Sequence, residues 1–144
     1  MAANRTTEYA VRALVVLEME GSRGKVRQAA ELAKLSGTPP KFLEQVLRIL
    51  TKGGLVRSRR GAGGGYELAR SAGKIRMDEV VHLVEGAREE FPGRMDPVGE
   101  EWVRIRTKSG QAAAEILHAE TLDRLVERIR SRILSTGKSA DYHI

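Results

Sequence analysis

The stretch that decides the fold class covers residues 38–70 and reads TPPKFLEQVLRILTKGGLVRSRRGAGGGYELAR. Its first part has apolar side chains at helical spacing, and Gly53-Gly54 then ends the helix. We expect Thr38 to cap this helix through its hydroxyl, with Pro39 at the first helical position, where no N–H donor is needed. The pattern predicts a helix whose buried side is made by Phe42, Leu43, Val46, Leu47, Ile49 and Leu50.

The second part of this stretch predicts a β-hairpin. Residues 55–59 and 65–69 have the pattern of two short strands, and Arg60-Gly61-Ala62-Gly63-Gly64 connects them. A glycine-rich connection with basic residues at its root is typical of the wing of a winged helix.

Helices are expected on both sides of this stretch. Apolar residues recur at helical spacing over residues 6–20 and 28–35, and after the hairpin over 76–86, 98–119 and 121–134. The helix over residues 98–119 could be interrupted at Gly110, because glycine costs about 1 kcal/mol in a helix interior relative to alanine. The order predicts a mainly α fold, a winged helix-turn-helix with a small two-stranded wing plus C-terminal dimerisation helices.

This order divides the chain into four predicted parts. Residues 1–86 are expected to form the winged helix-turn-helix DNA-binding domain and residues 87–97 a linker loop. Residues 98–135 would form a helical dimerisation region, and 136–144 a flexible tail.

The composition excludes several classes of protein. The chain of 144 residues contains no cysteine, so it has no disulfide, thiolate zinc site, catalytic thiol or cysteine-held iron–sulfur cluster. No run approaches the roughly 18 apolar residues of a membrane span, and the first residues lack the apolar core of a signal peptide. No nucleophile stands with a base at a recognisable spacing. We therefore expect a cytoplasmic protein that is not an enzyme, has no cofactor or metal, and does not contact a membrane.

Positive charge is concentrated in one part of the chain. The net charge is +6, but residues 41–76 alone hold nine Lys or Arg against Glu44 and Glu67, a local net charge of +7. A basic segment on a nearly neutral body is expected of a surface that binds phosphates, since each neutralised phosphate releases condensed counterions. The alternative is a solvated basic face without a partner.

The order of elements makes the third helix the one that enters the major groove of double-stranded DNA. Glutamine can pair with adenine through two hydrogen bonds, and Lys or Arg can donate to guanine. For Thr38 and Lys41 a contact to phosphate fits equally well, and Glu44 could accept from cytosine or pair with Arg48 one turn later. The predicted contacts on this helix are Thr38, Pro40, Lys41, Glu44, Gln45 and Arg48.

Arginines flank the predicted wing. Arg57, Arg59 and Arg60 are expected to contact the DNA backbone or a narrow minor groove, where guanidinium groups are favoured. The competing explanation is that they only make the wing soluble. The glycines of the wing would supply tight turns and close approach rather than contacts.

Several segments together resemble the Rrf-two family of winged-helix regulators, which includes IscR, NsrR and CymR. These segments are TEYAVRAL (residues 7–14), FLEQVL (42–47), GLVRSRRGAGGGYELAR (54–70) and VEG (84–86). The resemblance is close over residues 5–86 and loose over the C-terminal helices. The glycine-rich wing string is the most specific part of it.

This resemblance implies a bacterial transcriptional regulator, usually a repressor, that binds palindromic operators as a homodimer through a long C-terminal helix. Family positions that touch DNA map onto Thr38, Pro40, Lys41, Gln45, Arg59 and Arg60. Tyr9 matches an aromatic residue on the first helix of many members, with a phosphate contact or core packing as its role. Many members also hold an iron–sulfur cluster through three cysteines, which this chain lacks, so the resemblance is to the cysteine-poor branch.

Two further questions stay open at this level. The rival to a DNA-binding regulator is a protein-interaction module that keeps the winged-helix fold and binds DNA only incidentally. The effector, a small molecule or a protein, is not identified by any motif. Trp102, the only tryptophan, stands near the start of the dimerisation region, where it could line a ligand site or pack in the dimer interface.

Overall fold

The computed structural model describes residues 4–20, 26–86, 93–94 and 96–137. In chain order the elements are α1 (Arg5–Glu20), α2 (Ala29–Ser36), α3 (Pro40–Lys52), β1 (Val56–Arg59), β2 (Gly65–Leu68), the 3-10 turn η1 (Ala72–Lys74), α4 (Met77–Glu85), α5 (Pro97–Ala119) and α6 (Leu122–Ser135). The mainly helical winged helix-turn-helix predicted from the sequence is confirmed, with β1 and β2 as its two-stranded wing. Most of the linker loop and of the tail lies outside the described residues.

One hydrophobic core joins α1, α2, α3 and α4. Ala10, Leu14 and Val16 of α1 are buried against Leu32 of α2 and Leu43 of α3. On α3 the apolar residues at helical spacing, Leu43, Val46, Leu47 and Leu50, are all buried, while the polar residues between them are exposed. Burial of these side chains holds the helix in place, because a helix of this length is marginal alone in water.

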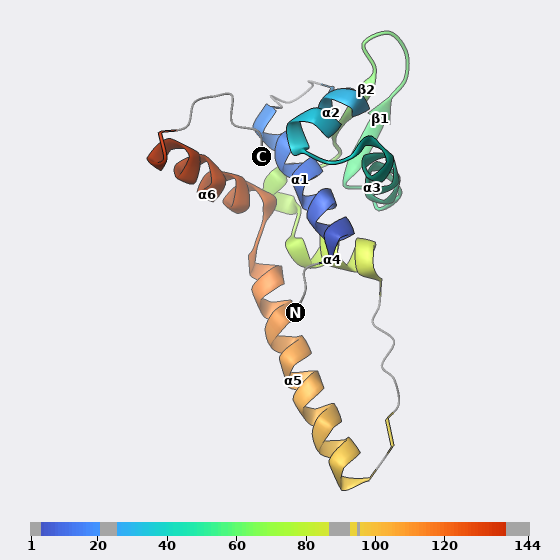
Figure 1. Ribbon diagram of the computed structural model, residues 1–144, viewed down its shortest axis with the longest axis vertical. Coiled ribbons are helices and arrows are strands. Elements are labelled where there is room, and N and C mark those ends of the chain that lie inside the picture. The colour runs from blue at the N-terminus through green and yellow to red at the C-terminus, as the bar shows by residue number, and fades with distance from the viewer. Residues whose placement is uncertain (1–3, 21–25, 87–92, 95, 138–144) are drawn as a thin grey trace.

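The two strands of the wing are antiparallel and stand beside α3 (Figure 1). Tyr66 also exchanges two backbone hydrogen bonds with Arg27, which precedes α2, so the wing is tied to the helical body. The close approach needs a glycine at position 65, since a Cβ there would lie 2.4 Å from the carbonyl oxygen of Arg27. The wing is therefore anchored to the body at the start of β2, and the connection that precedes this point projects from the body (Figure 1).

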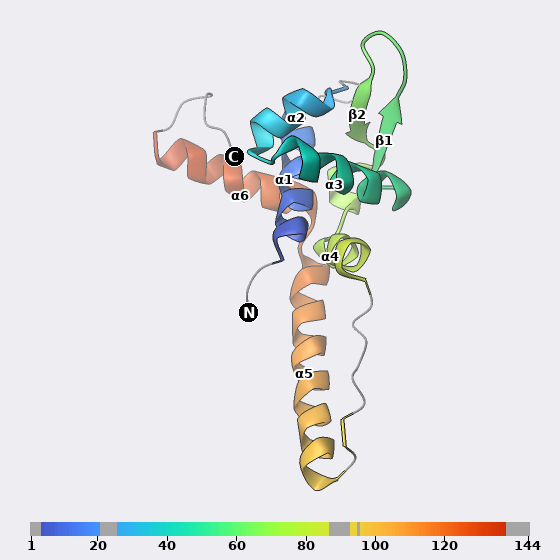
Figure 2. The same ribbon diagram turned by 45° about the vertical axis from the view of Figure 1, so that its right-hand side comes forward.

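The C-terminal helices differ from each other. α5 extends away from the other elements in both views and has no buried residue, and Gly110 does not interrupt it (Figures 1 and 2). α6 turns back onto α1 and η1, where Leu122 and Val126 are buried in the common core. The core thus extends beyond residues 1–86, and the region predicted as 98–135 consists of a helix that meets the body only near its C-terminal end and a second helix that packs on the core.

Candidate nucleic-acid interface

The outer face of α3 is a continuous polar surface. Pro40, Lys41, Glu44, Gln45 and Arg48 are all exposed, and their spacing places them on the side of the helix opposite the buried leucines. Among the residues that the structure describes, neither Glu44 nor Arg48 forms an ion pair. These side chains therefore face solvent on a helix that the core holds rigidly.

Thr38 lies below this surface. Its side chain is only 2% exposed, and its hydroxyl has no hydrogen-bond partner among the described residues. The predicted N-cap is wrong: the cap is Pro39, in an extended conformation, and Pro40 opens the helix. The reason is steric, because a residue that precedes proline is disfavoured in the helical region, so Pro39 cannot be helical before Pro40. A side-chain contact from Thr38 to DNA has no support in this position.

The predicted burial of Phe42 is also wrong. The helical period predicted that it would be buried, but it is 41% exposed and stacks on Tyr9 of α1, with ring centroids 5.7 Å apart. Tyr9 is half-buried in this contact. The aromatic pair therefore joins the start of α3 to α1 at the edge of the core, and packing is the role that the structure gives to Tyr9.

Arg57 and Arg59 of the wing share one carboxylate. The Nε–H groups of both donate to Oε1 of Glu67, at 2.7 Å and 2.9 Å. The register places Arg57 directly opposite Glu67, so all three side chains lie on one face of the hairpin. From the sequence alone, Glu67 stood out only as one of two acidic residues in the basic segment. The strand pattern could have revealed the pair, since opposite charges on facing strand positions attract.

Glu67 is held in its ionised form. The hydrogen bond from Arg57 is the largest influence and lowers the pKa of this carboxyl group, whereas burial acts in the opposite direction. Electrostatic attraction from both arginines and the hydrogen bond from Arg59 add to the lowering. The side chain of Glu67 is only 6% exposed, whereas those of Arg57 and Arg59 remain more than half exposed.

Arg60 differs from these two arginines. It is exposed at the start of the glycine-rich connection, and it has no ion pair with any residue in the described ranges. The connection adopts backbone conformations with positive φ at Gly61 and Gly63, which side chains other than glycine rarely adopt. Arg60 is thus the wing cation with its full charge available.

A groove of about 530 Å³ lies between α3 and the face of the wing opposite to the one that carries Arg57, Arg59 and Glu67. Glu44, Arg48 and Lys52 line its helical side. Ser58 and Tyr66, which oppose each other in the strand pair, line its wing side. Sequence reasoning did not select Lys52, Ser58 or Tyr66, because only the packing of the wing against α3 brings them to one surface.

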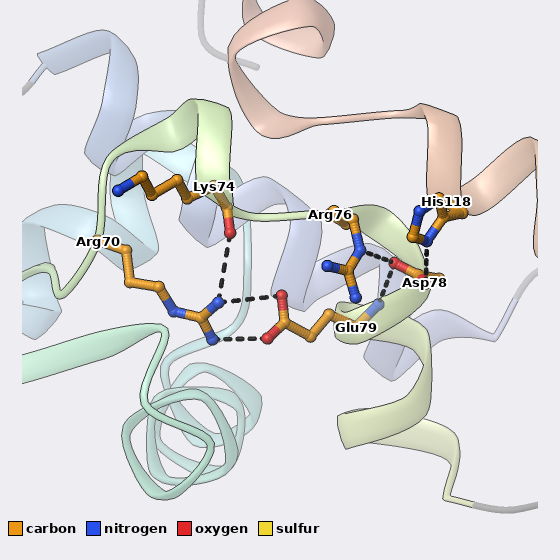
Figure 3. A network of polar contacts seen from close by, with 6 residues as sticks. All are labelled: Arg70, Lys74, Arg76, Asp78, Glu79 and His118. Atoms are coloured by element: carbon orange, nitrogen blue, oxygen red, sulfur yellow. Dashed lines mark hydrogen bonds and ion pairs between the residues drawn. The ribbon is translucent and has the colours of Figure 1, made fainter.

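A polar network joins the winged helix to the long helix (Figure 3). Arg70, which follows β2, donates to both carboxylate oxygens of Glu79 on α4, at 2.6 Å and 3.2 Å. Asp78, one residue earlier, accepts from Arg76 and contacts Nδ1 of His118 in the last turn of α5, both at 3.0 Å. The wing, α4 and α5 are therefore connected through adjacent carboxylates.

The balance at Asp78 favours the ionised carboxylate. Burial is the largest single influence and would raise its pKa, but the hydrogen bonds with His118 and Arg76, the charge of Arg76 and the backbone N–H of Glu79 together hold the pKa below its usual value. This keeps Asp78 charged between its two partners.

A family model described as "Iron-dependent Transcriptional regulator", Rrf2, matches residues 3–136. A sequence of Mycobacterium tuberculosis that carries the name of an HTH-type transcriptional regulator is 43% identical over 86 residues. The match covers 60% of this chain and 53% of the relative, so the chain spans about half the length of the curated relatives it matches first.

Solved structures match over most of the chain. CymR, the global cysteine regulator of B. subtilis, has a TM-score of 0.72 and 27% identity and covers 89% of this chain and 98% of its own. IscR of T. potens has a TM-score of 0.71 and 27% identity, with 90% and 88% covered. The likeness therefore includes the C-terminal helices as well as the winged helix.

The residues of this chain do not fit an iron site of the thiolate kind. The sequence has no cysteine, and the described residues contain no group of three His, Asp or Glu that could hold a metal ion. Within the same ranges, no helix is both long and apolar enough to cross a membrane.

Proposed function

Because this chain belongs to the Rrf2 family of transcriptional regulators, we propose that it is a sequence-specific DNA-binding regulator, a repressor that binds a palindromic operator as a homodimer. It would do so without an iron–sulfur cluster, since it has no cysteine to hold one. The observation that carries the proposal is the exposed polar face of α3, which stands beside a basic wing on a rigid core.

On α3, we assign the reading of bases to the exposed face. Lys41 and Arg48 would donate to guanine or phosphate, and Gln45 would pair with adenine. Pro40 and Glu44 complete the surface that enters the major groove. Thr38, being buried, is assigned a role in the turn before α3 instead.

On the wing, Arg60 would enter the minor groove or lie along phosphates, because it is exposed and forms no ion pair with any described residue. Arg57 and Arg59 bind Glu67 through their Nε–H groups, and among the described residues their Nη groups form no hydrogen bond, so they can donate to phosphates that approach the outer face of the wing. The groove between α3 and the wing adds Lys52 and Tyr66 at the edge of this surface.

The homodimer would form through α5. Val98, Trp102 and Ile116 are between 61% and 77% exposed on this helix, and apolar side chains of this size favour burial in an interface. Pairing of two α5 helices would carry two winged helices on one assembly. The half-sites would then lie about one helical turn apart, since both copies of α3 must enter the major groove from one side.

Selection of bound duplexes from a random DNA pool tests the proposal. We expect a palindromic consensus. Gln45→Ala should then relax the preference at one base position by about 1–3 kcal/mol, whereas Arg60→Ala should weaken binding to all sequences and reduce the salt dependence. If every duplex binds weakly and Arg60→Ala has no effect, the chain is a protein-interaction module with a winged-helix fold instead.

A further inference from the structure

The Arg57–Glu67–Arg59 cluster is built on the face of the wing that turns away from α3. Ser58 and Tyr66 line the groove toward α3, and successive residues of a strand point to opposite faces. The two arginines and Glu67 occupy the other face. A duplex seated on α3 therefore meets the groove side and the connection of the wing first.

The cluster holds two positive charges against one negative charge. Glu67 accepts from both Nε–H groups, so the net charge of the cluster is +1 rather than +2. Attraction between a protein and the DNA backbone depends on this net charge, whatever the base sequence and in any orientation that brings cations to phosphates. The negative charge of Glu67 thus weakens binding to DNA in orientations in which α3 does not enter the major groove.

We propose that Glu67 is a specificity-determining residue, which lowers the affinity of the wing for DNA of any sequence while α3 and Arg60 retain their contacts with the operator. This proposal rests on the proposed function, because it assumes that the operator is read by α3. The structural reason is that the carboxylate offsets charge on the outer face only. Arg60, which has no ion pair among the described residues, keeps its full charge.

Glu67→Gln separates charge from geometry. The amide oxygen of glutamine can still accept an Nε–H, and the side chain has nearly the same shape, but the negative charge is gone. For a duplex of shuffled sequence we expect about fivefold to tenfold tighter binding at about 0.1 M salt, with a plot of log affinity against log salt steeper by about 1. For the duplex selected from the random pool we expect less than about a twofold change, so the ratio of the two affinities falls.

Two further variants control this result. Glu120→Gln removes the same formal charge from an ion pair with Arg128 at the α5–α6 junction, and it should leave both affinities within about twofold. Adding Arg57→Gln to Glu67→Gln restores the cluster to +1, and it should return the shuffled duplex to its original affinity and salt dependence.

The outcomes separate the two proposals. If the unaltered protein shows no preference for any selected duplex, the proposed function fails. If it has a preference but Glu67→Gln tightens both duplexes equally, or weakens both, only the role of Glu67 is overturned. Should Glu67→Gln not fold, Arg57→Gln alone tests the same point, because the cluster then becomes neutral and the shuffled duplex should bind more weakly with a salt slope lower by about 1.

Discussion

α3 and α5 show two opposite ways of placing a helix in this protein. α3 has 13 residues, four of them buried, and presents its polar face from a fixed position. α5 has 23 residues and none is buried, although it carries Trp102, Ile105 and Ile116. The difference indicates that the winged helix has its core within one chain, whereas α5 exposes apolar side chains that the proposed dimer would cover.

The largest expected effect is a difference in the free energy of unfolding between a variant of α3 and a variant of α5. Leu50→Ala removes a fully buried side chain of α3, and it should lower the free energy of unfolding by about 3–5 kcal/mol. Ile116→Ala on α5, where the side chain is 67% exposed, should change it by less than about 0.5 kcal/mol in dilute protein. Urea unfolding followed by circular dichroism measures both. Equal losses at low protein concentration would mean that α5 is already covered in the monomer.

Leucine-to-alanine substitutions in α6 should lower stability strongly at the start of the helix, as in α3, and weakly at its end, as in α5. Leu122 is fully buried, so Leu122→Ala should cost about 2–3 kcal/mol of stability. Leu134 is 80% exposed, and Leu134→Ala should cost less than about 0.5 kcal/mol. The same unfolding experiment compares these matched leucines. A small loss for Leu122→Ala would contradict the packing of α6 on α1.

An interface on α5 should depend on Trp102. Its ring is 61% exposed, and buried tryptophans contribute strongly to protein interfaces, so Trp102→Ala should weaken dimer formation by about 1.5–2 kcal/mol, or more than tenfold. Sedimentation equilibrium measures this change, and the free energy of unfolding of the monomer serves as the control. A dimer of unchanged strength would place the interface elsewhere. A ligand that alters DNA binding without changing Trp102 fluorescence would count against an effector site there.

The smallest effect lies at the junction of the two regions. The pKa of Asp78 is below its usual value, so its stabilising contribution is complete above the pKa of the unfolded chain and is lost as the pH falls through the lower, folded value. Asp78→Asn should therefore cost less than about 1 kcal/mol at pH 7 and nothing near pH 2. Unfolding at the two pH values measures this difference. Glu101→Gln, which removes an exposed ion pair with Arg104 on α5, is the matched control variant.

Local pattern was enough to predict most of the elements. The strands expected at 55–59 and 65–69 are observed at Val56–Arg59 and Gly65–Leu68, and the helix periods of α1, α3 and α6 are confirmed to within about two residues. The turn η1 was missed, since three residues are too few to show a period. The polar face of α3 also followed from its period, because exposure on a packed helix alternates with burial.

Side-chain surroundings could not be predicted in this way. A helical period says which side of a helix is apolar, but not where the core ends, so Phe42 was expected inside although it stacks at the edge on Tyr9. The burial of Thr38 depends on how the turn before α3 packs on its neighbours. The sharing of Glu67 by two arginines depends on strand register and on side-chain conformations that bring both Nε–H groups to one carboxylate oxygen.

The sequence by itself determined the winged helix-turn-helix, the charge of its reading surface and the lack of thiolate ligands. These follow from residue type and spacing, which act over a few residues. Only the tertiary structure decided which wing arginines are paired with a carboxylate, that the start of α6 is buried in the core and that α5 meets the core only near its C-terminal end. Those outcomes depend on contacts between segments far apart in the chain, which no local period contains.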